Sequence, residues 1–131
     1  MANYRNVYMQ FWTDRKVIDN FTANDRYLYL YFLTNPHTSL CGCYEVSMNM
    51  AIVETGLTIV EIEESLERLE NNLNVIRYSH ETGEVLILNW PKYNWTKSGN
   101  TGVGVRNGIE AVKNIDFKGF LEECYEQYYS A

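Results

Sequence analysis

The segment 58–71 constrains the fold more than any other part of the chain, because it carries two separate marks of a helix. Thr58 and Glu61 form a capping box, in which each side chain can accept a hydrogen bond from the backbone N–H group of the other residue. The apolar residues of the segment share one helical face: Ile59, Ile62, Leu66 and Leu69. Such a face is stable only when it packs against other elements, so the chain should have a common core.

Two earlier segments are also predicted to be helices of this core. Thr22 can cap a helix whose apolar residues, spaced three and four apart, continue until Pro36 stops it. Ser47 can cap a second helix, which should end at Gly56 because glycine readily takes the left-handed backbone conformation found at helix ends. We expect the helix at 58–71 to bury its apolar face against the first of these two.

Short strands separate and follow the helices. Residues 75–78 and 85–88 flank a turn in which Gly83 can adopt a positive φ, so they should form a β-hairpin. Residues 43–46 are predicted to form a very short strand, and residues 7–12, which are β-prone, another. The order helix, strand, helix, helix, hairpin predicts an α+β fold of the winged helix-turn-helix type, with three helices around one core and the hairpin as its wing.

The chain is predicted to divide into a winged-helix domain over residues 1–98, a linker over 99–108 and a helical tail over 109–131. Four glycines between residues 98 and 108 make a helix there improbable, which is the reason for expecting a linker. The tail has six apolar residues on one stripe of a helix: Phe117, Phe120, Leu121, Cys124, Tyr125 and Tyr128. A short helix is marginal in water, so this stripe needs a partner surface. We expect a second copy of the chain, hence a homo-oligomer, with the chain's own core and a host protein as alternatives.

Composition places the chain among globular proteins, since 46% of the 131 residues are hydrophobic and 21% are charged. The formal net charge of −6 argues against a protein that coats nucleic acid through charge alone. No apolar run reaches the ~18 residues of a membrane span, and the first residues lack the apolar core of a signal peptide. We therefore expect a cytoplasmic protein with no membrane partner, whose three cysteines are reduced.

Residues suited to catalysis are scarce. The two histidines, His37 and His80, both lie in predicted turns, with no serine or cysteine placed to use them. Cys41 and Cys43 are close to His37, but a structural zinc site needs four ligands, and a tight turn with two small buried thiols is the favoured interpretation. The sequence thus predicts no enzymatic activity, no metal site and no cofactor.

Charge indicates where DNA could bind. Five glutamates and one arginine occupy residues 58–72, so the helix there is poorly suited to enter a DNA groove. Basic residues concentrate instead in the N-terminal segment and around the hairpin, and Tyr93 could either stack on an unpaired base or cover the hairpin. The predicted DNA-binding residues are Arg5, Arg15, Lys16, Arg68, Arg77, Lys92, Tyr93 and Lys97.

Several runs of the sequence fit one known family: FWTDRKV (11–17), DRYLYLYFLTNPHT (25–38), CGCYE (41–45) and VLILNWPKYNW (85–95). In this order they resemble the N-terminal domain of phage and prophage replisome organisers, the DnaD-like replication initiation proteins of Gram-positive bacteria. The resemblance covers residues 3–98. It implies a winged-helix module in a bacterial host cell that binds the phage replication origin, helps to recruit the host helicase loader or helicase, and often self-associates.

Two functions are therefore expected. The first is a non-enzymatic phage DNA replication initiation module that binds origin DNA and helps to recruit host helicase-loading machinery. The alternative is a protein-binding adaptor or inhibitor of a host protein on the same scaffold, with little or no DNA binding. The resemblance favours the first function, whereas the acidic helix at 58–71 favours the second.

Overall fold

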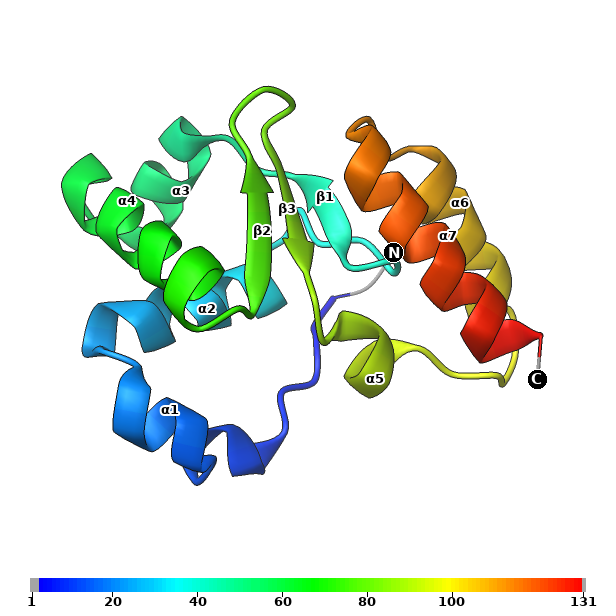
Figure 1. Cartoon of the computed structure of the whole chain (residues 1–131), viewed down its shortest axis with the longest axis horizontal. Helices are drawn as coiled ribbons and strands as arrows, with labels where there is room; N and C mark the ends of the chain where they lie inside the picture. Colours follow the sequence, from blue (N-terminus) through cyan, green and yellow to red (C-terminus); the bar gives the residue numbers. More distant parts are fainter. Residues whose placement is uncertain (1–2, 131) are drawn as a thin grey trace.

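The computed structural model of the protein describes residues 3–130, which form a mixed α+β structure (Figure 1). Residues 1, 2 and 131, the outer ends of the predicted domain and tail, lie outside the described residues. The helices are α1 (Arg15–Asn20), α2 (Ala23–Thr34), α3 (Met48–Thr55), α4 (Ile59–Glu67), α5 (Trp90–Asn94), α6 (Thr101–Glu110) and α7 (Ile115–Tyr129). A 3₁₀ turn (Met9–Trp12) precedes α1, and a π-helical turn (Arg68–Asn72) continues α4.

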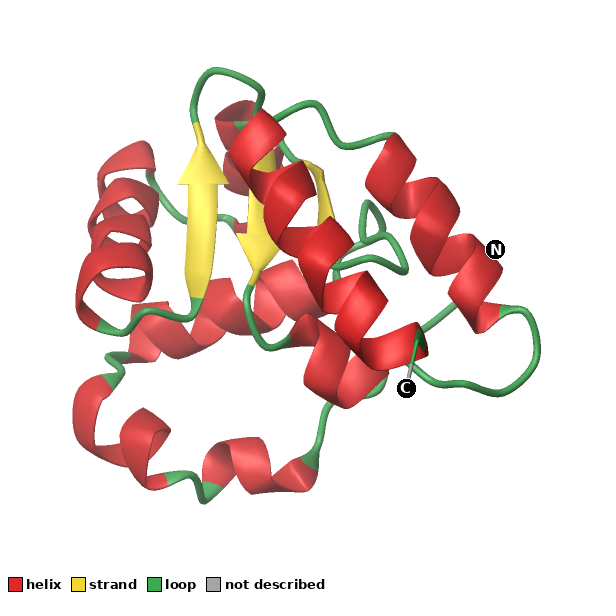
Figure 2. Cartoon of the chain, turned by 45° about the vertical axis from the view of Figure 1, so that its right-hand side comes forward, coloured by secondary structure: helices red, strands yellow, loops and turns green. Residues whose placement is uncertain are grey.

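A small antiparallel sheet lies among the helices (Figure 2). Its strands are β1 (Cys43–Glu45), β2 (Ile76–Ser79) and β3 (Glu84–Ile87), in the order β1-β3-β2. The predicted hairpin is confirmed: β2 and β3 pair with Tyr78 opposite Val85, while β1 pairs with the other edge of β3. The central strand β3 is buried along its whole length. In Figure 1, α3 and α4 lie to the left of the sheet, and α6 and α7 to the right.

The three core helices begin and end where their caps predict. Thr22 and Thr58 start α2 and α4 through capping boxes with Asp25 and Glu61. Gly56 ends α3 with a φ of 77°, a left-handed conformation that glycine adopts without a steric penalty. Local hydrogen bonding therefore determines these boundaries.

The predicted packing of α4 is also confirmed. Leu66 in α4 and Leu69 just beyond it are buried, and α4 packs against α2, whose Leu28 and Phe32 are fully buried. Ile59, the first residue of the predicted apolar face, is 39% exposed because it lies at the helix start, beyond the reach of the core. The other members of that face form one continuous core with the sheet.

The predicted strand at residues 7–12 is wrong. Met9–Trp12 forms a 3₁₀ turn, in which the Phe11 N–H donates to the Tyr8 carbonyl oxygen at 3.0 Å. The Phe11 ring packs against Tyr29 of α2, with 6.1 Å between the ring centroids. β propensity largely measures how a side chain fits its surroundings, and here the surroundings are a helix and not a sheet edge.

The predicted linker at 99–108 is also wrong, because Thr101–Glu110 is the helix α6 with Val105 and Ile109 buried. Its glycines allow close packing. A Cβ atom at Gly104 would lie 2.4 Å from Leu40 Cδ1, and one at Gly108 would lie 3.1 Å from Cys41 Sγ. The glycines cost helix propensity, but they let α6 approach the 40–43 turn, and the burial gained there offsets that cost.

The apolar stripe of the tail is covered mostly within the chain. The helix α7 packs along α6, and Leu121 is fully buried, while Phe117, Cys124, Tyr125 and Tyr128 are partly buried against the core. This arrangement removes the reason for expecting a second copy of the chain on the stripe. Phe120, 38% exposed, is its most accessible member.

A buried carboxylate fastens the tail to the sheet. Glu84 at the start of β3 is 2% exposed and accepts hydrogen bonds from the backbone N–H groups of Lys113 and Asn114, both at 2.8 Å. At the other end of α7, the Tyr128 hydroxyl donates to the Trp95 carbonyl oxygen at 2.9 Å. The chain from 101 to 130 is therefore packed onto the core and not joined to it by a loose connection.

Candidate nucleic-acid interface

The exposed face of α4 is acidic and apolar. Glu63, Glu64 and Glu67 are exposed, and so is Val60, at 61%. Carboxylates repel the phosphate backbone, and this face lacks the arginine, lysine, asparagine or glutamine that reads base edges. The exposed face of α4 therefore has the acidic character that its composition indicated.

Arg68, a predicted DNA-binding residue, is engaged inside the protein. Its guanidinium pairs with the fully buried Asp25 at 3.0 Å and donates to Ser65 Oγ at 3.3 Å. Burial alone would raise the pKa of the Asp25 carboxyl, but the hydrogen bonds from Arg68 and from the Thr22 N–H outweigh it and hold this pKa below its ordinary value. Arg68 therefore links α4 to α2.

Arg77 is similarly held by its neighbours. Its guanidinium donates to Asn74 Oδ1 at 2.7 Å and to the carbonyl oxygen of Ile76 at 2.8 Å. Arg15 is well exposed and pairs weakly with Asp19 one helical turn later, at 3.4 Å. Arg77 is thus held by neighbours in the fold, whereas the Arg15 side chain remains exposed.

Three other predicted basic residues lie over aromatic rings. The Arg5 guanidinium is 5.6 Å from the centre of the Trp90 ring, Lys92 Nζ is 5.3 Å from that of Tyr93, and Lys97 Nζ is 5.5 Å from that of Tyr128. Cation–π contact of this kind keeps a charge beside a ring without removing it from solvent.

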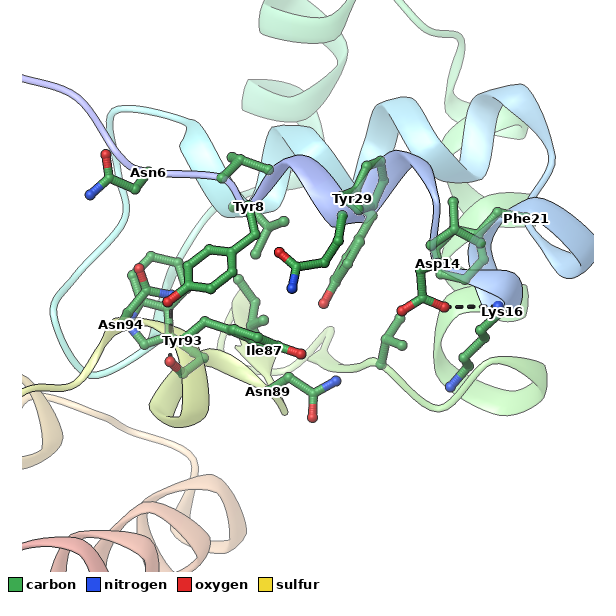
Figure 3. A pocket seen from close by; sticks show the side chains of 17 residues that line it. Asn6, Tyr8, Asp14, Lys16, Phe21, Tyr29, Ile87, Asn89, Tyr93 and Asn94 are labelled. Carbon is green, nitrogen blue, oxygen red and sulfur yellow. Dashed lines mark hydrogen bonds between the residues drawn. The ribbon is translucent and has the colours of Figure 1, made fainter.

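The N-terminal segment forms one wall of a partly open cavity of about 140 Å³, whose other walls are α2, the end of β3 and α5 (Figure 3). Its walls combine aromatic rings and apolar side chains with amides and two charged groups. The polar and aromatic lining residues include Asn6, Tyr8, Gln10, Phe11, Asp14, Lys16, Phe21, Tyr29, Asn89, Trp90, Tyr93 and Asn94. Of the predicted DNA-binding residues, Lys16 and Tyr93 line this cavity directly, and Arg5 and Lys92 lie against rings that line it.

Tyr29 is the most unusual group in the cavity. The residue is only 8% exposed, and Figure 3 shows its hydroxyl directed toward the middle of the cavity. Burial, followed by the influence of Tyr93 and Asp14, raises the pKa of Tyr29 to about 12, so the phenol stays protonated and can donate.

Sequence reasoning missed this cavity because its walls come from segments far apart in the chain, 6–17, 21–33, and 75–94. Tyr29 belongs to a helix whose apolar spacing explains it as a core residue. The one local signal was the density of aromatic and amide side chains in 4–12 and again in 89–95, the two segments that meet here.

Comparisons with models of protein families, with curated proteins and with solved structures each gave no significant match. None of the helices between residues 3 and 130 combines the length and the apolar character that crossing a membrane requires.

Proposed function

We propose that the protein is a non-enzymatic module of phage DNA replication initiation, built on a winged-helix scaffold, that binds origin DNA and helps to recruit the host helicase loader or helicase. One observation carries the proposal. The elements α2, β1, α3, α4, β2 and β3 follow one another in the winged-helix order, and β1 pairs beside β3 in a sheet ordered β1-β3-β2. The resemblance to replisome organisers over residues 3–98 supports the same scaffold.

DNA contact on this proposal comes from the N-terminal segment and α5. Residues 3–17 hold three basic side chains and one acidic side chain in a chain whose net charge is −6. Lys16 and Lys92 are both exposed, and one lines the cavity while the other lies on the adjoining Tyr93 ring. An acidic α4 would face away from the phosphates, since like charges raise the free energy of the complex.

The alternative function, a protein-binding adaptor or inhibitor of a host protein, is favoured by the same helix α4. Val60 is exposed, and the carboxylates of Glu63 and Glu64 follow it one helical turn later, so this face suits a protein partner with a basic, partly apolar surface. The two functions predict opposite effects of removing these charges.

A DNA titration at two salt concentrations, with single-stranded and duplex origin DNA and an unrelated sequence as control, separates the two functions. The double variant Lys16→Ala/Lys92→Ala should weaken binding and lower the salt dependence by about one unit of slope per lost phosphate contact. The matched control is Lys113→Ala/Lys118→Ala, which removes the same charge near the start of α7 and should have a smaller effect. In the same titration Glu63→Gln/Glu67→Gln should tighten DNA binding.

Equal losses of DNA affinity in both lysine variants would show that only the total charge of the protein matters. That result would contradict the assignment of DNA contact to the N-terminal segment and α5. Absence of DNA binding by the unaltered protein, together with loss of host-protein binding in Glu63→Gln/Glu67→Gln, would replace the replication module with the adaptor.

A further inference from the structure

We propose that the cavity between the N-terminal segment and α5 takes one unpaired pyrimidine base of a DNA single strand. This inference rests on the proposed function, and it specifies which form of DNA the module holds. A strand that has been opened at an origin exposes such bases, whereas a duplex keeps their edges paired and their faces stacked.

The size of the cavity fits a single aromatic ring. Its volume is about 140 Å³. An apolar cavity of ~150 Å³ inside a protein can hold benzene, so this space suits a six-membered ring and not a base pair. A pyrimidine is such a ring, and a purine is larger by a second fused ring.

The walls offer both surfaces that a base requires. Tyr8 and Tyr93 approach each other with 5.0 Å between ring centroids, and each residue is almost half exposed, so an entering base can stack on an aromatic ring. The amides of Asn89 and Asn94 can both donate and accept, as the edge of a pyrimidine does. Tyr29, whose side chain is largely buried, directs a protonated hydroxyl toward the middle of the cavity, where a pyrimidine carbonyl oxygen could accept a hydrogen bond from it.

Charge favours a nucleic acid over a peptide as the occupant. Lys16 lines the cavity and Lys92 lies on the Tyr93 ring at its edge, so two exposed cations are available to the phosphates beside a bound base, whereas Arg5 donates to Thr38. The carboxylate of Asp14 uses one oxygen to accept the Lys16 N–H at 2.8 Å, and its other oxygen can accept from an N–H group of a base, such as N3–H of thymine. An apolar peptide side chain would use none of these groups.

Fluorescence anisotropy with labelled oligothymidylate tests the inference on the full chain, with oligodeoxyadenylate and a duplex as comparison ligands. We expect oligothymidylate to bind more tightly than oligodeoxyadenylate. Tyr93→Ala should weaken its binding about tenfold, the loss typical of one base–aromatic stack. Tyr29→Phe, which removes only the hydroxyl, should weaken it about threefold, as for one neutral hydrogen bond. The matched control is Tyr27→Phe, since this tyrosine of α2 lies outside the cavity and bonds the Thr55 carbonyl oxygen, and it should bind as the unaltered protein does.

Photo-crosslinking with an oligonucleotide that contains 5-iodouracil locates the base directly, and crosslinks are expected at Tyr8, Tyr29 or Tyr93. Crosslinks confined to other regions, or unchanged affinity in both Tyr29→Phe and Tyr93→Ala, would overturn the inference. The proposed function would survive that result if Lys16→Ala/Lys92→Ala still weakened binding. If Tyr93→Ala abolished self-association but left DNA binding unchanged, the cavity would belong to a contact between copies of the chain. This result too would overturn the inference.

Discussion

At the scale of single residues, the structure uses several charged groups in ways that their sequence positions do not suggest. Asp25 serves as the capping-box residue of α2 and as the partner of Arg68, and Glu84 binds two backbone N–H groups of the segment that leads into α7. Each of these carboxylates is almost fully buried. A buried charge is tolerated only when its hydrogen bonds are satisfied. Both residues therefore hold two elements in a fixed relative position through these bonds.

Asp25 should give the protein a measurable acid sensitivity. Because its pKa is lower in the folded state than the ordinary 3.8, the ionised carboxylate stabilises the fold at neutral pH, and this contribution is lost as the pH falls through 3.8 and then through the lower folded-state pKa. Asp25→Asn should reduce the free energy of unfolding at pH 7 by about 1.5 to 3 kcal/mol, the net contribution of hydrogen bonds to a charged group. It should also flatten the acid limb of a plot of stability against pH.

Urea unfolding followed by circular dichroism over a series of pH values makes this measurement. Asp19→Asn, which removes an exposed carboxylate that forms only a weak pair, is the control and should leave the stability within about 0.5 kcal/mol. An acid limb as steep in Asp25→Asn as in the unaltered protein would contradict the assignment.

At the scale of elements, α6 shows how contacts between segments can decide whether a glycine-rich stretch is helical. Gly108 lies against Cys41, which is fully buried and therefore has little room to move, whereas Gly119 in α7 has nothing near the position of a Cβ atom. The same substitution should consequently have opposite effects at these two helical positions.

Gly108→Ala should destabilise the protein by about 1 to 2 kcal/mol, because the strain of overpacking exceeds the gain in helix propensity. Gly119→Ala should stabilise it by about 0.5 to 1 kcal/mol, since only the gain in propensity applies. Thermal unfolding of the two variants side by side gives the comparison. A rise in the midpoint for both would mean that α6 does not pack closely on the 40–43 turn.

At the scale of the whole molecule, the C-terminal helices complete the core. Removing residues 109–131 would uncover Trp95, which is 4% exposed and touches three tyrosines of α7, and would leave the Glu84 carboxylate without its backbone donors. We expect the truncated chain to lose several kcal/mol of stability, since the apolar surface that α7 covers would return to water at a cost of about 25 cal/mol per Å².

A thermal unfolding scan of the truncated chain, with sedimentation of the full chain beside it, checks this expectation. Glu84→Gln serves as the control that weakens the same hydrogen bonds while keeping α7. The expectation would be contradicted if the truncated chain had an unchanged unfolding midpoint and the full chain sedimented as a dimer. The tail would then be an association element, as the sequence predicts.

The sequence by itself determined the elements whose signals are local. The capping boxes at Thr22 and Thr58, the left-handed end at Gly56 and the turn at Gly83 each act within a few residues, so the three core helices and the hairpin could be predicted from neighbouring side chains alone. The acidic character of α4, which argues against groove reading, was likewise evident from composition.

Only the tertiary structure decided the features that depend on distant partners. The segment 7–12 turns because Phe11 meets Tyr29, and 101–110 is a helix because its glycines fit against Leu40 and Cys41. The candidate cavity needs three separated segments at once, and in the sequence Tyr29 looks like an ordinary core tyrosine. Propensity and spacing describe what a segment prefers when alone, and packing against distant residues outweighs that preference wherever the burial gained exceeds the few tenths of a kcal/mol by which local preferences differ.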